Sequence, residues 1–127
     1  MGGNAGTQSS TIFARGLVLG HITPKEFKKH FLKEVFVGLT IGTILGVLTG
    51  FIASAWQGIE GLGLTVGISL ALTMTLATSL GFLIPFLLFK VGADQAAGSD
   101  PIITTIKDIS GLLIYFFLAS QFLGYLL

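Results

Sequence analysis

The uncharged stretch VFVGLTIGTILGVLTGFIASA, from Val35 to Ala55, decides the fold class of this chain. A helix needs roughly 20 residues to cross the hydrocarbon core of a bilayer, and this stretch has that length. From Phe36 to Phe89 the only charged side chain is Glu60. Because a charge at the centre of a bilayer costs about 2.5–3.5 kcal/mol on insertion scales, this gap in charge predicts membrane-spanning helices.

Two further stretches are long and apolar enough to cross a bilayer. They run from Leu62 to Phe89 and from Ile102 to Leu126, and the polar segments 57–63 and 90–101 read as loops. The first segment, 1–19, is polar and glycine-rich before it becomes apolar, and it is too short to span a bilayer. We interpret it as the end of a truncated membrane helix. The sequence therefore predicts an all-α integral membrane protein with three full transmembrane helices.

The first span carries a glycine at every fourth position, namely Gly38, Gly42, Gly46 and Gly50. Residues at this spacing form one stripe along a helix. Small residues on such a stripe let the backbone of another helix approach closely, although glycine is also generally common in membrane helices. We expect the stripe to pack against a neighbouring helix.

A basic segment precedes the first span. Thr23 can cap a helix there, with Pro24 at the first helical position and Glu26 three residues after the cap, as in a capping box. Phe27 and Phe31 fall on one face, and lysines occupy mainly the other faces. The segment predicts a short amphipathic helix at the membrane interface, and a basic helical extension of the first span is the equal alternative.

Basic residues predict the orientation of the spans. They gather in the segment 15–33 and recur at Lys90, whereas the loop between the first two spans has none. Because cytoplasmic loops carry an excess of Lys and Arg, we expect the segment 15–33 and the loop 90–100 to be cytoplasmic. The 56–62 loop and the C-terminus are then outside, in a multi-pass protein of the cell membrane.

The composition excludes several functional classes. Apolar residues make up 52% of the 127 residues and charged residues 10%, against about 25% charged in soluble domains. There is no cysteine, which removes disulfides, thiolate metal ligands and cysteine nucleophiles. A net charge of +1 without a basic, aromatic-rich patch indicates no nucleic-acid partner. No catalytic constellation is present, so we expect neither an enzyme nor an organic cofactor.

Asp108 is the strongest candidate site residue. A carboxylate about two turns into a membrane helix is a functional candidate by default, and an ion pair with Lys107 near the interface is the alternative. Two copies of Asp108 would face each other across the axis of a symmetric dimer. Mg²⁺ usually keeps several waters and binds one or two carboxylates, so such a ring suits a hydrated Mg²⁺ ion.

Two other places hold polar groups that lipid disfavours. In the glycine-rich start of the chain, Asn4 and Gln8 fall one turn apart if helical, and their oxygens could bind a hydrated cation through its waters. A linker is the alternative for that run. At Asp100-Pro101 we expect an ordinary helix start, with a secondary, cation-attracting role as the other interpretation.

Four motifs, in order and spacing along nearly the whole chain, resemble the MgtE family of magnesium channels. They are Gly2-Gly3-Asn4-Ala5-Gly6-Thr7-Gln8-Ser9-Ser10-Thr11-Ile12 with Arg15-Gly16-Leu17, Phe31-Leu32-Lys33-Glu34 leading into Val37-Gly38-Leu39, Gly81 with Ile84-Pro85-Phe86-Leu87-Leu88, and Pro101 with Thr104-Thr105, Asp108 and Gly111-Leu112-Leu113-Ile114-Tyr115. Each motif alone is a weak signal, and four in register are a strong one. Lys107, beside Asp108, departs from the family pattern.

The resemblance implies a homodimer with five membrane helices per subunit and a pore lined by the second and fifth. Asp108 would then be the principal ion-selecting residue, with Thr104 facing the pore one turn earlier. Asn4 would lie in the matching stretch of the other pore helix. The further pore-lining positions would be Gly2, Gly3 and Gln8 on that helix and Gly111 on the fifth helix. The chain would be a partial transmembrane domain, 1–127, without the first helix, most of the second or the regulatory domains. It would then be either a fragment or a chain that works with a separately encoded N-terminal or regulatory part.

The expected function is passive, channel-like flux of Mg²⁺, the transported ion, through a homodimeric pore in the lipid bilayer. A coupled carrier for another divalent cation is one alternative, and it would need a titrating group such as Asp108. A non-conducting membrane subunit or fragment is the other, and it would be indifferent to Asp108→Ala.

Overall fold

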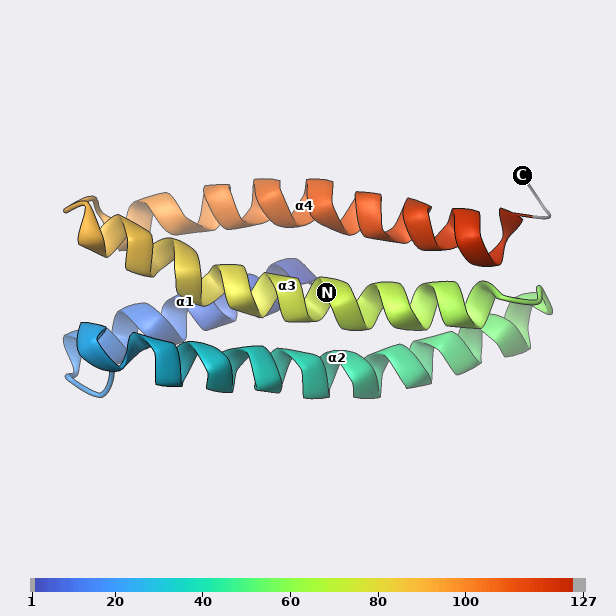
Figure 1. The fold of residues 1–127 in the computed structure, drawn as a ribbon, viewed down its shortest axis with the longest axis horizontal. Helices are drawn as coiled ribbons and strands as arrows, with labels where there is room; N and C mark the ends of the chain where they lie inside the picture. Colours follow the sequence, from blue (N-terminus) through green and yellow to red (C-terminus); the bar gives the residue numbers. More distant parts are fainter. Residues whose placement is uncertain (1, 125–127) are drawn as a thin grey trace.

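The computed structural model describes residues 2–124, without the side chains of 95–98. Among these residues the secondary structure is entirely helical. The elements are α1 (Gly2–Val18), the 3-10 helix η1 (Pro24–Glu26), α2 (Phe27–Gln57), α3 (Leu62–Lys90) and α4 (Gln95–Phe122). The last three helices run side by side along the length of the molecule in alternating directions (Figure 1). Three segments are long and apolar enough to cross a membrane: Pro24–Gln57, Leu62–Lys90 and Ser99–Phe122. The predicted all-α membrane fold is confirmed.

The glycine stripe joins α2 to α3. The buried residues of α2 are Gly38, Gly42, Gly46 and Gly50. A Cβ added at Gly42 would lie 2.9 Å from the carbonyl oxygen of Ala71, and one added at Gly50 would lie 2.6 Å from that of Gly63. Only a hydrogen atom fits at such positions, so the two backbones are in contact. The predicted close packing of the stripe is confirmed.

Aromatic side chains hold the end of α1, the start of α2 and the end of α3 together. Phe13 is buried and makes edge contacts with Phe27, Phe82 and Phe86. Phe27 also stacks on Phe86, with ring centroids 3.7 Å apart. The apolar face of the basic segment therefore packs on protein rather than on a membrane surface, because α1 and α3 bring aromatic rings to it.

The basic segment is continuous with the first span. η1 leads directly into α2, which runs without a break to Gln57. Thr23 occupies the cap position of η1 but makes no side-chain capping hydrogen bond. The segment is therefore the helical extension that the sequence left open, and the separate amphipathic helix with its capping box does not form.

The start of α4 differs from the prediction. The helix begins at Gln95 and contains Pro101, so Asp100-Pro101 lies inside it and is not a helix start. Ser99 and Ile103, one turn apart, are completely buried. Their packing keeps this turn helical although a proline there removes one backbone hydrogen bond. At the other end α4 stops at Phe122, and the predicted end at Leu126 lies outside the described residues.

α1 is a short helix packed against α3 and α4. Figure 1 shows that it begins about midway along the molecule and ends beside the start of α2. A Cβ added at Gly6 would lie 2.8 Å from a methyl group of Ile103 on α4 and 3.2 Å from the carbonyl oxygen of Ala77 on α3. The glycines of α1 thus let its first residues reach the middle of the bundle.

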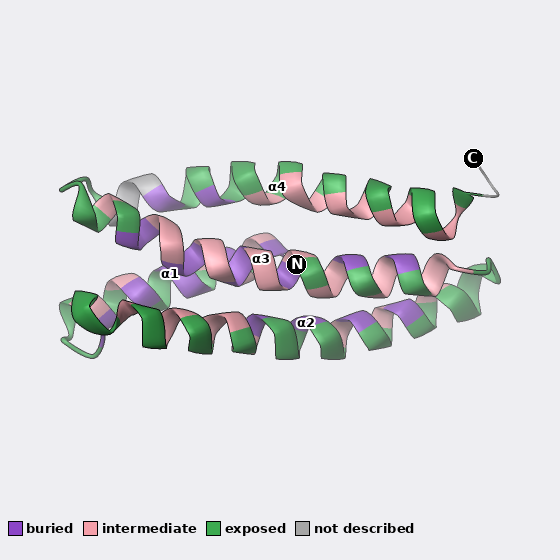
Figure 2. Cartoon of the chain, in the orientation of Figure 1, coloured by how far each residue is buried: buried purple, intermediate pink, exposed green. Residues whose placement is uncertain are grey.

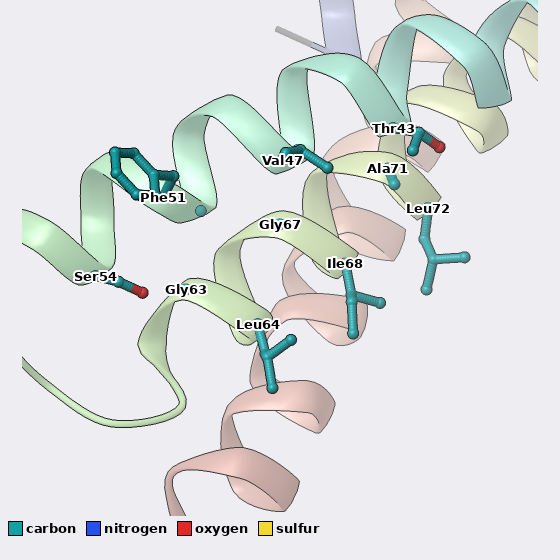
Figure 3. A pocket seen from close by; sticks show the side chains of 12 residues that line it. Thr43, Val47, Phe51, Ser54, Gly63, Leu64, Gly67, Ile68, Ala71 and Leu72 are labelled. Atoms are coloured by element: carbon teal, nitrogen blue, oxygen red, sulfur yellow. The ribbon is translucent and has the colours of Figure 1, made fainter.

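The outward faces of α2 and α4 are exposed (Figure 2), and they carry many large apolar side chains. A groove of about 530 Å³ runs between α2 and α3, and Figure 3 shows Gly63 and Gly67 at its floor with Val47, Phe51 and Leu64 beside it. Apart from Thr43 and Ser54, the residues that line the groove are glycine or apolar. Such surfaces are compatible with lipid tails or with another helix.

Candidate cation site on α4 and α1

Asp108 lies halfway along the 28-residue helix α4. At 1.5 Å per residue it is about 14 Å from Ser99, where the candidate span begins. Its side chain is 56% exposed. A charged group at this depth is rarely in contact with lipid and usually faces a bundle interior or a water-filled path. We therefore expect the exposed part of the Asp108 side chain to contact water or a second protein surface rather than lipid.

Lys107 pairs with Asp108, through its Nζ and the Oδ1 of the carboxylate. The lysine side chain is only 17% exposed. It lies along the start of α1, where a Cβ added at Gly2 would be 3.1 Å from its Cδ and one at Gly3 would be 3.2 Å from its Nζ. The two glycines therefore make room for the lysine. The ion pair that the sequence left open is present, at mid-span rather than near the interface.

A cavity of about 590 Å³ connects Asp108 with α1 and α3. Its lining includes three of the predicted site residues, Gly2, Asp108 and Gly111. Ser69 and Thr73 of α3 add hydroxyl groups to the same wall. The Ser69 Oγ is buried and makes no hydrogen bond to any described residue. The cavity thus brings hydroxyl groups and an ion pair together among apolar side chains, and sequence patterns could not locate it because its lining comes from four helices.

Asn4 and Gln8 line a different cavity, of about 330 Å³, between α1, α2 and α3. Both are exposed, and they share this cavity with Ser9 and Glu34. The Ser9 Oγ donates a hydrogen bond to the Glu34 Oε1 at 2.5 Å. The sequence interpretation did not single out Glu34, although an acidic residue directly before the uncharged stretch was the available signal.

The remaining predicted residues lie at the surface of the chain or beside Lys107. Thr104 is exposed one turn before Asp108 and lines neither of the cavities just described. Gly3 contacts Lys107 from α1. Within residues 2–124 no three His, Asp or Glu side chains gather to hold a metal ion. One copy of the chain therefore offers a cation a single carboxylate at Asp108, with Thr104 on the same exposed face of α4.

The sequence of the chain is similar to those of known proteins. A family model described as a divalent cation transporter, MgtE, matches residues 1–118. A magnesium transporter MgtE of Enterococcus faecalis is 38% identical over 97% of the chain, and one of Bacillus subtilis is 39% identical over 97%. Another from Thermus thermophilus is 39% identical over 96% of the chain. The chain spans 27% of the length of each of these relatives. It belongs to the MgtE family of divalent cation transporters.

Proposed function

We propose that this chain forms part of a pore through which Mg²⁺ crosses the cell membrane passively, between two copies related by a two-fold axis. The observation that carries the proposal is the exposed carboxylate of Asp108 halfway along a membrane-spanning helix. Lipid is an unfavourable neighbour for that group, and a water-filled path at a dimer axis is a favourable one. The magnesium transporters among its relatives support the choice of ion.

The chemistry of the site suits a hydrated divalent ion. Two symmetry-related Asp108 side chains would supply one carboxylate each, and Mg²⁺ commonly binds in this way while keeping several waters. Thr104 lies on the same exposed face of α4, where its hydroxyl could accept hydrogen bonds from those waters. Gly2 and Gly111 line the cavity at Asp108, whereas Asn4 and Gln8 line a separate cavity and would contact the hydrated ion at another point of the path. The proposal needs no organic cofactor.

Passive flux differs from coupled transport because the membrane potential and the Mg²⁺ gradient alone drive it. A divalent ion gains about 4.6 kcal/mol per 100 mV, twice the value for a single charge. Liposomes that contain the chain and a Mg²⁺-sensitive dye should therefore take up Mg²⁺ faster under an inside-negative potassium diffusion potential. No proton or sodium gradient should be needed. Liposomes without protein, at the same potential, are the control.

Other results of that assay identify the alternatives. Uptake that requires a proton or sodium gradient would indicate a coupled carrier. Absence of uptake from a correctly inserted chain would indicate either a non-conducting subunit, which contradicts the proposal, or a pore that needs further helices. If there is no uptake, the same assay on a longer protein that supplies those helices separates the two explanations.

The proposed orientation places the two ends of α2 on opposite sides of the membrane, with its start in the cytoplasm and its end outside. Lys28 and Gln57 are exposed near the two ends of this helix, and the sequence has no native cysteine. We expect a membrane-impermeant maleimide to label Gln57→Cys in intact cells and Lys28→Cys only after permeabilisation. The reverse labelling pattern would show that the basic segment is outside and would contradict the orientation.

A further inference from the structure

Lys107 stands apart from the other basic residues of the chain. Six of the seven Lys and Arg residues fall within 15–33 or at Lys90, where the helices meet the proposed cytoplasmic surface. Lys107 is the exception, at mid-span and directly beside Asp108. A lysine at this depth is costly in a membrane unless it is paired. Anchoring a helix at the membrane interface therefore does not explain its position.

The surroundings of Lys107 hold its ammonium group at the carboxylate. The stem of the side chain lies against Gly2 and Gly3, and the Nζ pairs with the Asp108 Oδ1. The Lys107 side chain is far less exposed than that of Asp108, so the lysine approaches from the protein side and leaves the outer side of the carboxylate open. The ammonium thus neutralises Asp108 without covering it.

A neutral pair binds a divalent cation less tightly than a free carboxylate does. An ion that reaches Asp108 is repelled by the ammonium group of Lys107, which is bound to the same carboxylate. The ion must displace that ammonium group or share the carboxylate with it. In a symmetric dimer the ring would carry two carboxylates and two ammonium groups. Conduction requires an ion to leave its site as well as to enter it, so weaker binding can raise the maximum rate.

We propose that Lys107 is a built-in competing cation that weakens Mg²⁺ binding at Asp108 and so speeds release of the ion. This inference rests on the proposed function. It adds a specificity- and rate-determining residue to the path. A side chain at position 2 or 3 would crowd the lysine, because a Cβ there would lie 3.1 Å from its Cδ or 3.2 Å from its Nζ.

The test compares Mg²⁺ uptake by the chain with uptake by Lys107→Met, in liposomes over a range of Mg²⁺ concentrations. Methionine keeps an unbranched stem against Gly2 and Gly3 but carries no charge. We expect the half-saturating Mg²⁺ concentration to fall about tenfold, because the repelling charge is gone, and the maximum rate to fall as well. Lys107→Arg should stay close to the parent chain.

Lys90→Met is the matched control. Lys90 lies 4.9 Å from the centre of the Phe86 ring near the end of α3, away from Asp108, so its loss should leave the half-saturating concentration unchanged. Lys107→Gln repeats the test with a second neutral side chain in case Lys107→Met does not fold.

Each outcome bears on a defined claim. An unchanged half-saturating concentration in the neutral Lys107 variants, with Asp108-dependent uptake intact, would overturn the role of Lys107 and leave the proposed pore standing. Higher half-saturating concentrations in those variants would also overturn it and show that the lysine helps to bind the ion. Uptake by the parent chain that does not depend on Asp108 would instead overturn the proposed site itself.

Discussion

Asp108→Ala should reduce Mg²⁺ uptake by at least about 100-fold. Two unit charges 4 Å apart interact by about 4 kcal/mol at the effective dielectric of a protein surface, and each 1.4 kcal/mol corresponds to a factor of ten. A divalent ion loses more interaction energy than these roughly 4 kcal/mol, about twice as much for each carboxylate, when both carboxylates of the dimer are removed. The substitution also leaves Lys107 without its partner, so the site becomes repulsive for cations. Fluorescence of a Mg²⁺-sensitive dye in liposomes measures the loss.

Controls for this variant come from the same helix. Asp100→Ala removes an exposed carboxylate near the start of α4 and should retain most of the flux. Asp108→Asn keeps the shape of the side chain, so a loss as large as that of Asp108→Ala would assign the effect to charge. Full flux through Asp108→Ala, in a chain that has inserted correctly, would place the selective site elsewhere and remove the main support for the proposed pore.

Gly46→Leu should prevent α2 from packing against α3. A Cβ at this position would overlap the carbonyl oxygen of Gly67, which belongs to the backbone and cannot rotate away. Overpacking of a core commonly costs about 1–3 kcal/mol, and a whole leucine side chain between two touching backbones should exceed that range. We expect a large drop in the midpoint of thermal unfolding in detergent, or no folded protein at all.

Val47→Leu is the control for helix packing. Val47 is the next residue of α2, and its side chain is exposed and lies beside the groove in Figure 3. The added methylene group has open space there, so the unfolding midpoint should stay close to that of the parent chain. Equal stability of Gly46→Leu and Val47→Leu would contradict the backbone contact at the glycine stripe.

Much of the fold could be predicted because its signals are local. Length and hydropathy located the second span to within one residue of α3, since an uncharged apolar run of about 20 residues has few alternatives to a membrane helix. The spacing of Gly38, Gly42, Gly46 and Gly50 predicted a contact face before its partner was known. Asp108 was identified for the same reason, because a charge stands out within an apolar helix.

The features that could not be predicted depend on residues far apart in the sequence. Pro101 suggested a helix start by its own conformational preference, but Ser99 and Ile103 are packed inside the bundle and keep the turn before it helical. The face formed by Phe27 and Phe31 looked like a membrane-binding surface until α1 and α3 supplied Phe13 and Phe86 to cover Phe27.

The candidate site divides in the same way. The amino-acid sequence by itself determined that a carboxylate stands in the third span, with Thr104 one turn before it, because both facts follow from order and helical periodicity. Only the tertiary structure decided that Lys107 lies against Gly2 and Gly3 and that Asn4 opens into a different cavity from Asp108. Those relations depend on how closely α1 approaches α3 and α4, and that distance is set by side-chain volume at contacts between helices rather than by any pattern along one of them.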